Sequence, residues 1–106
     1  MTKILIDENL PKKLKYRFGD NFEILTVHDM GWASKKNGEL LKLIEAEKFD
    51  FFLTVDKNIE YQQNIDKIKL GLIILITNDN RYEMVLPFDE KIRTELTTNK
   101  SKLIRL

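Results

Sequence analysis

Two apolar runs constrain the fold of this chain more than any other feature. They are Phe51–Val55 and Leu70–Ile76, and neither shows the apolar–polar alternation of a strand with one solvated face. Strands of this composition are buried on both faces, as in a parallel sheet that crossover helices cover. The sequence therefore predicts an α/β fold built on a mostly parallel sheet.

Helical and strand segments alternate along the rest of the chain. Strands are expected at 3–7, 23–27, 51–55, 70–76 and 102–106, the last as a short edge strand. Helices are expected up to about residue 18, over 38–48, around 58–67 and near 88–97. Asn9 and Pro11 open the first helix and Asn37 caps the second. This order predicts a single three-layer α/β sandwich.

Length and composition exclude several classes of protein. A chain of 106 residues fits one domain, and 18 Lys and Arg against 17 Asp and Glu give a net charge of +1, so any nucleic-acid partner needs a local patch. The absence of cysteine excludes disulfides and thiolate metal sites. No apolar run is long enough for a membrane span, and Asp7 comes too early for a signal peptide. We expect a cytoplasmic protein.

Three acidic residues stand where apolar segments end. Asp7 and Asp56 follow predicted strands, and Glu39 lies in the first turn of the helix over 38–48. Ligands of parallel α/β sheets bind beyond the carboxyl ends of the strands, so we expect these acids to meet there. Crowded carboxylates repel each other unless a cation binds, and oxygen ligands suit Mg²⁺ or Mn²⁺. Such a site can hydrolyse phosphodiesters with a metal-bound water.

Polar and basic residues around these acids complete the predicted site. Four residues offer amide or hydroxyl groups that can orient ligand waters or bind phosphate oxygens: Asn9, Thr54, Asn58 and Asn78. Lys57 directly follows Asp56. Cations that can follow a phosphate backbone are Lys12, Lys13, Lys15, Arg17, Lys35 and Lys36, with Trp32 and Tyr61 available for base stacking.

Each of these residues also has a purely structural interpretation. Asp7, Glu8 and Glu39 can complement a helix dipole, and Asp56 can cap the segment that follows it. The lysines of the first helix can form a solvated face, and Trp32 can pack over the sheet. The joint placement of the three acids at strand and helix ends is what favours a site.

Three segments resemble the small PIN-like proteins of the DUF5615 (Mut7-C-like) family. They are Ile4–Pro11, Lys36–Leu41 and Phe49–Asn64, and the likeness extends over residues 3 to about 80. The resemblance implies a PIN-like fold with a five-stranded parallel sheet of order 3-2-1-4-5. It also implies a magnesium-dependent ribonuclease centre at Asp7, Glu39 and Asp56, with Glu8 as a helper.

The resemblance also implies a biological setting, and the sequence departs from the family pattern at two positions. Many relatives look like toxins that a small DNA-binding antitoxin neutralises, and a homo-oligomer is also left open. Asn37 stands where many relatives carry an acid, and the fourth acid of active PIN nucleases has no secure counterpart here. Asn78 or Asp79 can substitute for it.

Two other functions remain open. A response-regulator receiver domain also places acids after its first and third strands and a threonine, here Thr77, after its fourth, but its lysine follows the fifth strand, whereas Lys102 begins that strand here. A small phosphodonor that labels Asp56 would identify a receiver. In a catalytically silent binding module the acids are structural, and calorimetry would detect no divalent-ion binding.

Overall fold

The computed structural model describes residues 2–19, 21–35, 37–56, 71–77, 81, 85–98 and 103–105. Its elements in chain order are β1 (Thr2–Ile6), the 3₁₀ helix η1 (Lys12–Arg17), β2 (Phe22–Thr26), α1 (Asn37–Ala46), β3 (Phe51–Thr54), β4 (Gly71–Ile74), the 3₁₀ helix η3 (Leu86–Phe88), α4 (Asp89–Thr98) and β5 (Leu103–Arg105). The helix predicted around 58–67 lies outside the described residues.

The sheet is parallel throughout, with strand order β2-β1-β3-β4-β5. The predicted order 3-2-1-4-5 is therefore wrong, because β1 pairs with both β2 and β3, and α1 carries the chain from β2 past β1 to its other side. The order places β5, as predicted, at one edge, beside β4.

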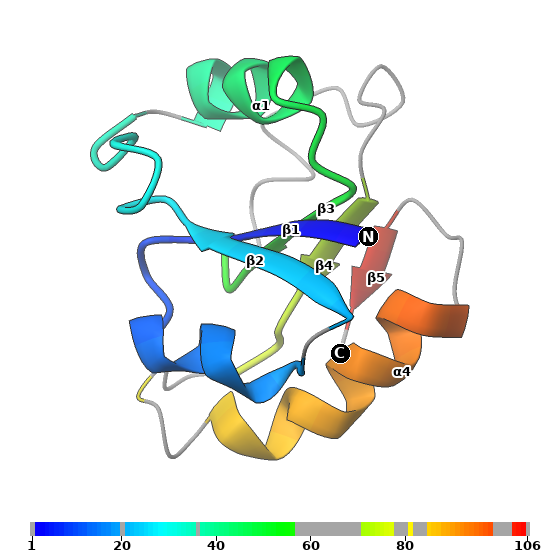
Figure 1. Cartoon of the computed structure of the whole chain (residues 1–106). Coiled ribbons are helices and arrows are strands. Elements are labelled where there is room, and N and C mark those ends of the chain that lie inside the picture. The colour runs from blue at the N-terminus through cyan, green and yellow to red at the C-terminus, as the bar shows by residue number, and fades with distance from the viewer. Residues whose placement is uncertain are drawn as a thin grey trace.

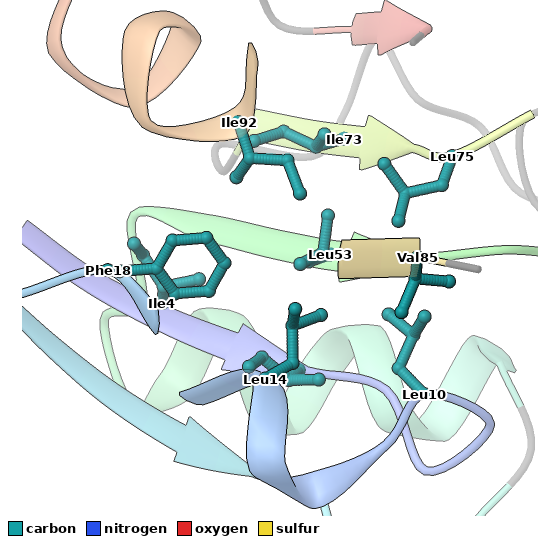
Figure 2. Packing of buried hydrophobic residues seen from close by; sticks show 10 residues of the cluster. Ile4, Leu10, Leu14, Phe18, Leu53, Ile73, Leu75, Val85 and Ile92 are labelled. Carbon is teal, nitrogen blue, oxygen red and sulfur yellow. The ribbon is translucent and has the colours of Figure 1, made fainter. Parts of the chain in front are cut away.

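Helices cover both faces of this sheet, which confirms the predicted α/β class (Figure 1). On one face, α1 packs on alternate strand residues such as Leu5, Phe52 and Leu72. On the other face, η1 and α4 pack on the intervening positions, such as Ile4 and Leu53. Figure 2 shows this second core, to which the predicted core residues Leu10, Leu14 and Phe18 all contribute.

The first helix differs from the prediction in type and in capping. It is a 3₁₀ helix, and the Leu14 N–H donates to the Pro11 carbonyl at 3.1 Å. Pro11 is the N-cap residue, in an extended conformation, and no side chain caps this end, so the predicted Asn9 cap is wrong. The tight helix still turns Leu14 and Phe18 into the core while its basic residues face solvent.

Helix α1 begins at Asn37, which is its first residue rather than the residue before it, and ends at Ala46, two residues before the predicted end. Its end is a Schellman motif, because Lys48 N–H donates to the Glu45 carbonyl at 3.0 Å and Phe49 N–H to the Ile44 carbonyl at 3.3 Å. Lys48 adopts φ 60, a conformation that glycine usually occupies at this position.

Helix α4 agrees closely with the helix predicted near 88–97, and Pro87 lies in the 3₁₀ turn that leads into it. Among the described residues, no helix has the length and apolar character needed to cross a membrane.

Candidate functional site

The carboxyl ends of β1 and β3 form the topological switch point of the sheet. From β1 the chain continues to β2 on one side, and from β3 it continues to β4 on the other. In open α/β sheets the crevice at such a point is the usual ligand site. Asp7 directly follows β1, and Asp56 comes two residues after the end of β3. The sequence prediction that these two acids share one edge is consistent with this topology.

Asp7 is held nearly buried at this edge, with 8% of its surface exposed. Its backbone N–H donates to the Leu53 carbonyl at 2.9 Å and so continues the pairing of β1 with β3 by one residue. Its carboxylate accepts two hydrogen bonds, from the Thr54 hydroxyl at 2.6 Å and from the Glu8 N–H at 2.8 Å. Both donors are uncharged, so the charge of Asp7 is stabilised by dipoles alone in these two contacts.

Thr54 connects the two acids. Its buried hydroxyl donates to Asp7 Oδ2 and accepts a hydrogen bond from the Asp56 N–H at 3.0 Å. A threonine hydroxyl has one donor and two acceptor lone pairs, so a single group serves both neighbours. Thr54 therefore fixes the orientation of the Asp7 carboxylate and the backbone position of Asp56 together.

Burial raises the pKa of the Asp7 carboxyl above its usual range. The hydrogen bonds from Thr54 and from Glu8 N–H act against this rise, whereas the negative charges of Glu8 and Asp56 add to it. Asp56 is thus close enough to Asp7 to repel it electrostatically. A divalent cation bound beside such a carboxyl would strongly stabilise its ionised form.

Glu8 links this edge to the loop that precedes α1. Each of its carboxylate oxygens lies 3.4 Å from the Ser34 backbone N, within hydrogen-bond distance. Ser34 adopts φ 75, a left-handed conformation that is uncommon for a residue with a side chain. The contact brings residues 33–35, and with them the approach to α1, beside the acids that follow β1.

Glu39 is not part of the Asp7–Thr54–Asp56 network. Its carboxylate forms an ion pair with Lys35, with a distance of 3.0 Å from Nζ to Oε1, and its side chain is 59% exposed. Within the described ranges, no group of three or more His, Cys, Asp and Glu residues is spaced to hold a metal ion. The structure thus brings Asp7 and Asp56 together and leaves Glu39 paired with a lysine at the start of α1.

The donor set of Asp7 and Asp56 fits Mg²⁺ or Mn²⁺ in part. These ions bind proteins through one or two carboxylates and keep several waters, so two acids are enough to hold one ion. Such an ion would offset the cost of ionising the buried Asp7 carboxyl. Glu39 is paired with Lys35 instead, and exposed pairs of this kind are worth roughly 0.2–1 kcal/mol.

The other predicted site residues fall into three groups. Asn9 lies exposed in the turn after Asp7, and the cations Lys12, Lys13 and Lys35 are exposed. Trp32 is half-buried, with its ring edge-on to Phe49 at 6.3 Å between centroids, which supports its packing role. The residues that lie outside the described part of the chain are Lys36, Lys57, Asn58, Tyr61, Asn78 and Asp79.

The sequence analysis missed one residue of this region. Ser34 donates its backbone N–H to the Glu8 carboxylate, and the type of its side chain gives no signal of such a contact.

Comparison of the chain with known proteins adds no assignment to this geometry. No family model matches it, and neither the curated proteins nor the solved structures include a significant match. The functional conclusion therefore depends on the residues themselves: a buried aspartate, a bridging threonine and a second aspartate at the switch point of a parallel sheet.

Proposed function

We propose that this chain is a metal-dependent endoribonuclease whose centre is the Thr54-bridged pair Asp7 and Asp56. The observation that carries the proposal is the buried Asp7 carboxylate, which accepts only uncharged donors in its two hydrogen bonds and is repelled by the neighbouring acids. Structural carboxylates buried to this degree are normally paired with a basic group. Burial is the main cause of the raised pKa of Asp7, with a smaller contribution from the charges of Glu8 and Asp56, and carboxyls perturbed in this way cluster at functional sites.

Asp7 and Asp56 would hold Mg²⁺ or Mn²⁺, and Glu39 would complete the site. The bound ion supplies a water of lowered pKa and charge stabilisation for the phosphodiester. Thr54 keeps one Asp7 oxygen occupied and thereby presents the other lone pairs in a fixed direction. The exposed Lys35 would meet an RNA phosphate, which would compete with Glu39 for the same ammonium group and free the Glu39 carboxylate.

The proposed substrate is RNA, and the proposed setting is that of a toxin with a small DNA-binding antitoxin. Both come from the resemblance of Ile4–Pro11, Lys36–Leu41 and Phe49–Asn64 to PIN-like proteins. The exposed cations of η1, five residues beyond Asp7, support a polyanionic substrate. The antitoxin and any homo-oligomer are proposals of the same kind.

The test is cleavage of RNA by the purified chain with Mg²⁺ or Mn²⁺. We expect wild type to cleave, and Asp56→Asn and Asp7→Asn to lose at least about 100-fold in rate, since each removes a proposed metal ligand. Asp50→Asn is the matched control, because Asp50 precedes the same strand β3 and lies at the opposite edge, where it accepts a hydrogen bond from the Lys3 N–H. It should cleave as wild type does.

Two results would contradict the proposal. One is a wild-type chain that cleaves no RNA and shows no divalent-ion binding by calorimetry, which would favour a silent binding module. The other is cleavage that survives in Asp7→Asn and Asp56→Asn, since a contaminating nuclease would then explain the activity.

The strand order favours one competing function, a receiver-like phospho-acceptor domain. The order β2-β1-β3-β4-β5 is that of doubly wound receiver folds. However, a receiver lysine follows its fifth strand, whereas Lys102 precedes the residues of β5 in the sequence. Incubation with a small phosphodonor and Mg²⁺ distinguishes the two functions. A stable phosphoryl group on Asp56 of the wild type, absent from the Asp56→Asn variant, would favour the receiver function over the nuclease.

A further inference from the structure

Strand β2 stands at one end of the strand order, so one of its two long sides has no strand of the sheet beside it (Figure 1). The pairing with β1 shows which backbone groups point to that side. The Val27 N–H donates to the Ile6 carbonyl at 3.0 Å, so residues 23, 25 and 27 bond to β1 and residues 22, 24 and 26 point outward. Unpaired groups along a strand edge are a template for a further strand.

Only part of this edge is open. At Thr26 the outward N–H donates to Asp29 Oδ2 at 2.9 Å, and the outward carbonyl accepts a hydrogen bond from the Met30 N–H at 3.2 Å. The loop that follows β2 therefore closes this end of the edge. At Phe22 and Ile24, no group in the described part of the chain bonds to the outward N–H or carbonyl. The open edge thus consists of two donors and two acceptors, at Phe22 and Ile24.

The side chains beside the open edge suit an added strand. Phe22 and Ile24 are half-buried against the core that η1 and α4 cover, and Leu25 is half-buried against the core beneath α1. A strand laid along the edge would cover more of this apolar surface on both faces. Edges are commonly blocked by proline, lysine or a bulge, and Phe22–Thr26 contains neither residue and keeps a continuous register with β1.

Glu23 is the one charged side chain of β2, and it determines which strand fits. It is exposed and, among the residues that the structure describes, has no ion pair or hydrogen bond through its side chain. Lys3 lies opposite it on β1 but donates to the Glu47 carbonyl at 2.9 Å instead. Opposite charges stabilise directly opposed residues of neighbouring strands, so this carboxylate favours a basic residue on the added strand.

A second copy of the chain is a poor occupant of this edge. The two-fold antiparallel register that bonds Phe22 to Ile24 of a second copy is centred on Glu23. It places the two Glu23 side chains directly opposite each other in a non-hydrogen-bonded pair, where side chains approach most closely and like charges destabilise. A register centred on Ile24 requires the backbone groups of Thr26, which are already bonded.

We propose that the open edge of β2 binds an extended segment of a different protein, which adds an antiparallel strand and places a lysine or arginine opposite Glu23. Strand addition is a general mode of peptide recognition, and otherwise parallel sheets often carry an antiparallel edge strand. Phe22 pairs with Thr2, at the end of β1 remote from Asp7, so a bound segment leaves the acids accessible. The inference therefore does not depend on the proposed nuclease activity.

The experiment titrates the ¹⁵N-labelled full chain with the acetylated and amidated peptide Thr-Val-Lys-Val-Thr. In the proposed register the two valines bond to Phe22 and Ile24, so we expect the amide signals of these two residues to shift and their hydrogen exchange to slow. N-methylation of both valines should abolish binding, because their N–H groups would face β2. N-methylation of the lysine should leave the affinity within about twofold, because its N–H would face away from β2.

Charge exchange tests the register. Glu23→Lys should weaken binding of this peptide about fivefold, and the peptide Thr-Val-Glu-Val-Thr should bind that variant as the lysine peptide binds the wild type, because the opposed charges attract again. Glu90→Lys changes an exposed acid of α4 and is the matched control. It should leave the affinity for the lysine peptide unchanged.

Three results would overturn the inference. The first is a lysine peptide that leaves the Phe22 and Ile24 signals unchanged at millimolar concentration. The second is binding that survives N-methylation of both valines. The third is a wild-type chain that dimerises without peptide and protects these two amides from exchange. None of these measurements involves RNA, so a failure of the proposed cleavage would leave this surface as it stands.

Discussion

At the scale of single residues, Thr54 determines more of the candidate site than either acid does. Its hydroxyl is the donor to Asp7 and the acceptor for Asp56 N–H, and the side chain is fully buried. Because it lies at the last position of β3, its geometry is set by the sheet and not by a loop. Catalytic side chains supported in this way keep their orientation without help from the substrate.

Replacing Thr54 by valine tests this role, since the two side chains have nearly the same shape. The variant leaves a nearly buried carboxylate oxygen without its donor, and we expect a loss of about 1–3 kcal/mol in the free energy of unfolding. The pKa of Asp7 should rise further, because the Thr54 hydrogen bond lowers it. Urea denaturation and a carbon-detected NMR titration of Asp7 measure the two effects.

Thr54→Ser is the matched control because it keeps the hydroxyl and loses only a methyl group. It should leave the pKa of Asp7 close to that of the wild type. A valine variant with wild-type stability and an unchanged Asp7 titration would show that the hydrogen bond from Thr54 to Asp7 contributes nothing to stability.

The sequence predicted the placement of Asp7 and Asp56 but not the partner of Glu39. Both aspartates follow buried strands, and parallel strands bring their carboxyl ends to one edge, so the pattern is sufficient. Glu39 is exposed and pairs with Lys35, four residues earlier. Exposed ion pairs of this kind contribute less than about 1 kcal/mol to stability. Differences of that size are not encoded in residue type and spacing.

At the scale of elements, the apolar runs predicted the ends of every described strand within one residue, except that β4 ends at Ile74, two residues before the predicted end. The strand order could not be read in the same way, because the buried strands β1, β3 and β4 have similar composition on both faces. Order is set by which neighbours fit side by side, a property of tertiary packing.

The end of α1 allows a prediction at this scale. Lys48 adopts a left-handed conformation with φ 60, which costs a residue with a side chain roughly 1 kcal/mol and costs glycine almost nothing. Lys48→Gly should therefore raise the free energy of unfolding by about 0.5–1 kcal/mol, measured by urea denaturation.

Two controls separate this effect from loss of charge and from general glycine flexibility. Lys48→Ala removes the same charge and keeps the strain, so it should not be stabilising. Lys42→Gly, within the same helix and exposed, should destabilise by about 1 kcal/mol. If Lys48→Gly proves destabilising, the Schellman end is not strained in solution.

At the scale of the whole molecule, the site sets how stability depends on pH. The folded-state pKa of Asp7 is raised, so between about pH 4, where the unfolded side chain titrates, and the folded pKa the native state binds more protons than the unfolded state. The contribution of Asp7 to stability therefore falls as pH rises through this window. Above the folded pKa the chain carries the full cost of ionising a buried carboxylate.

Asp7→Asn removes that cost. In EDTA we expect the variant to be more stable than the wild type at neutral pH, with a difference that shrinks as pH falls through the folded pKa and disappears below about pH 4. Asp29→Asn should behave in the opposite way, because the hydrogen bond from Thr26 N–H lowers the pKa of Asp29 and its stabilisation is lost as pH falls. Urea unfolding of the three proteins across pH 3–8 measures these curves. An Asp7→Asn variant that is less stable than the wild type at every pH would mean that Asp7 is structural, whereas the expected gain identifies a residue kept at the expense of stability, as function requires.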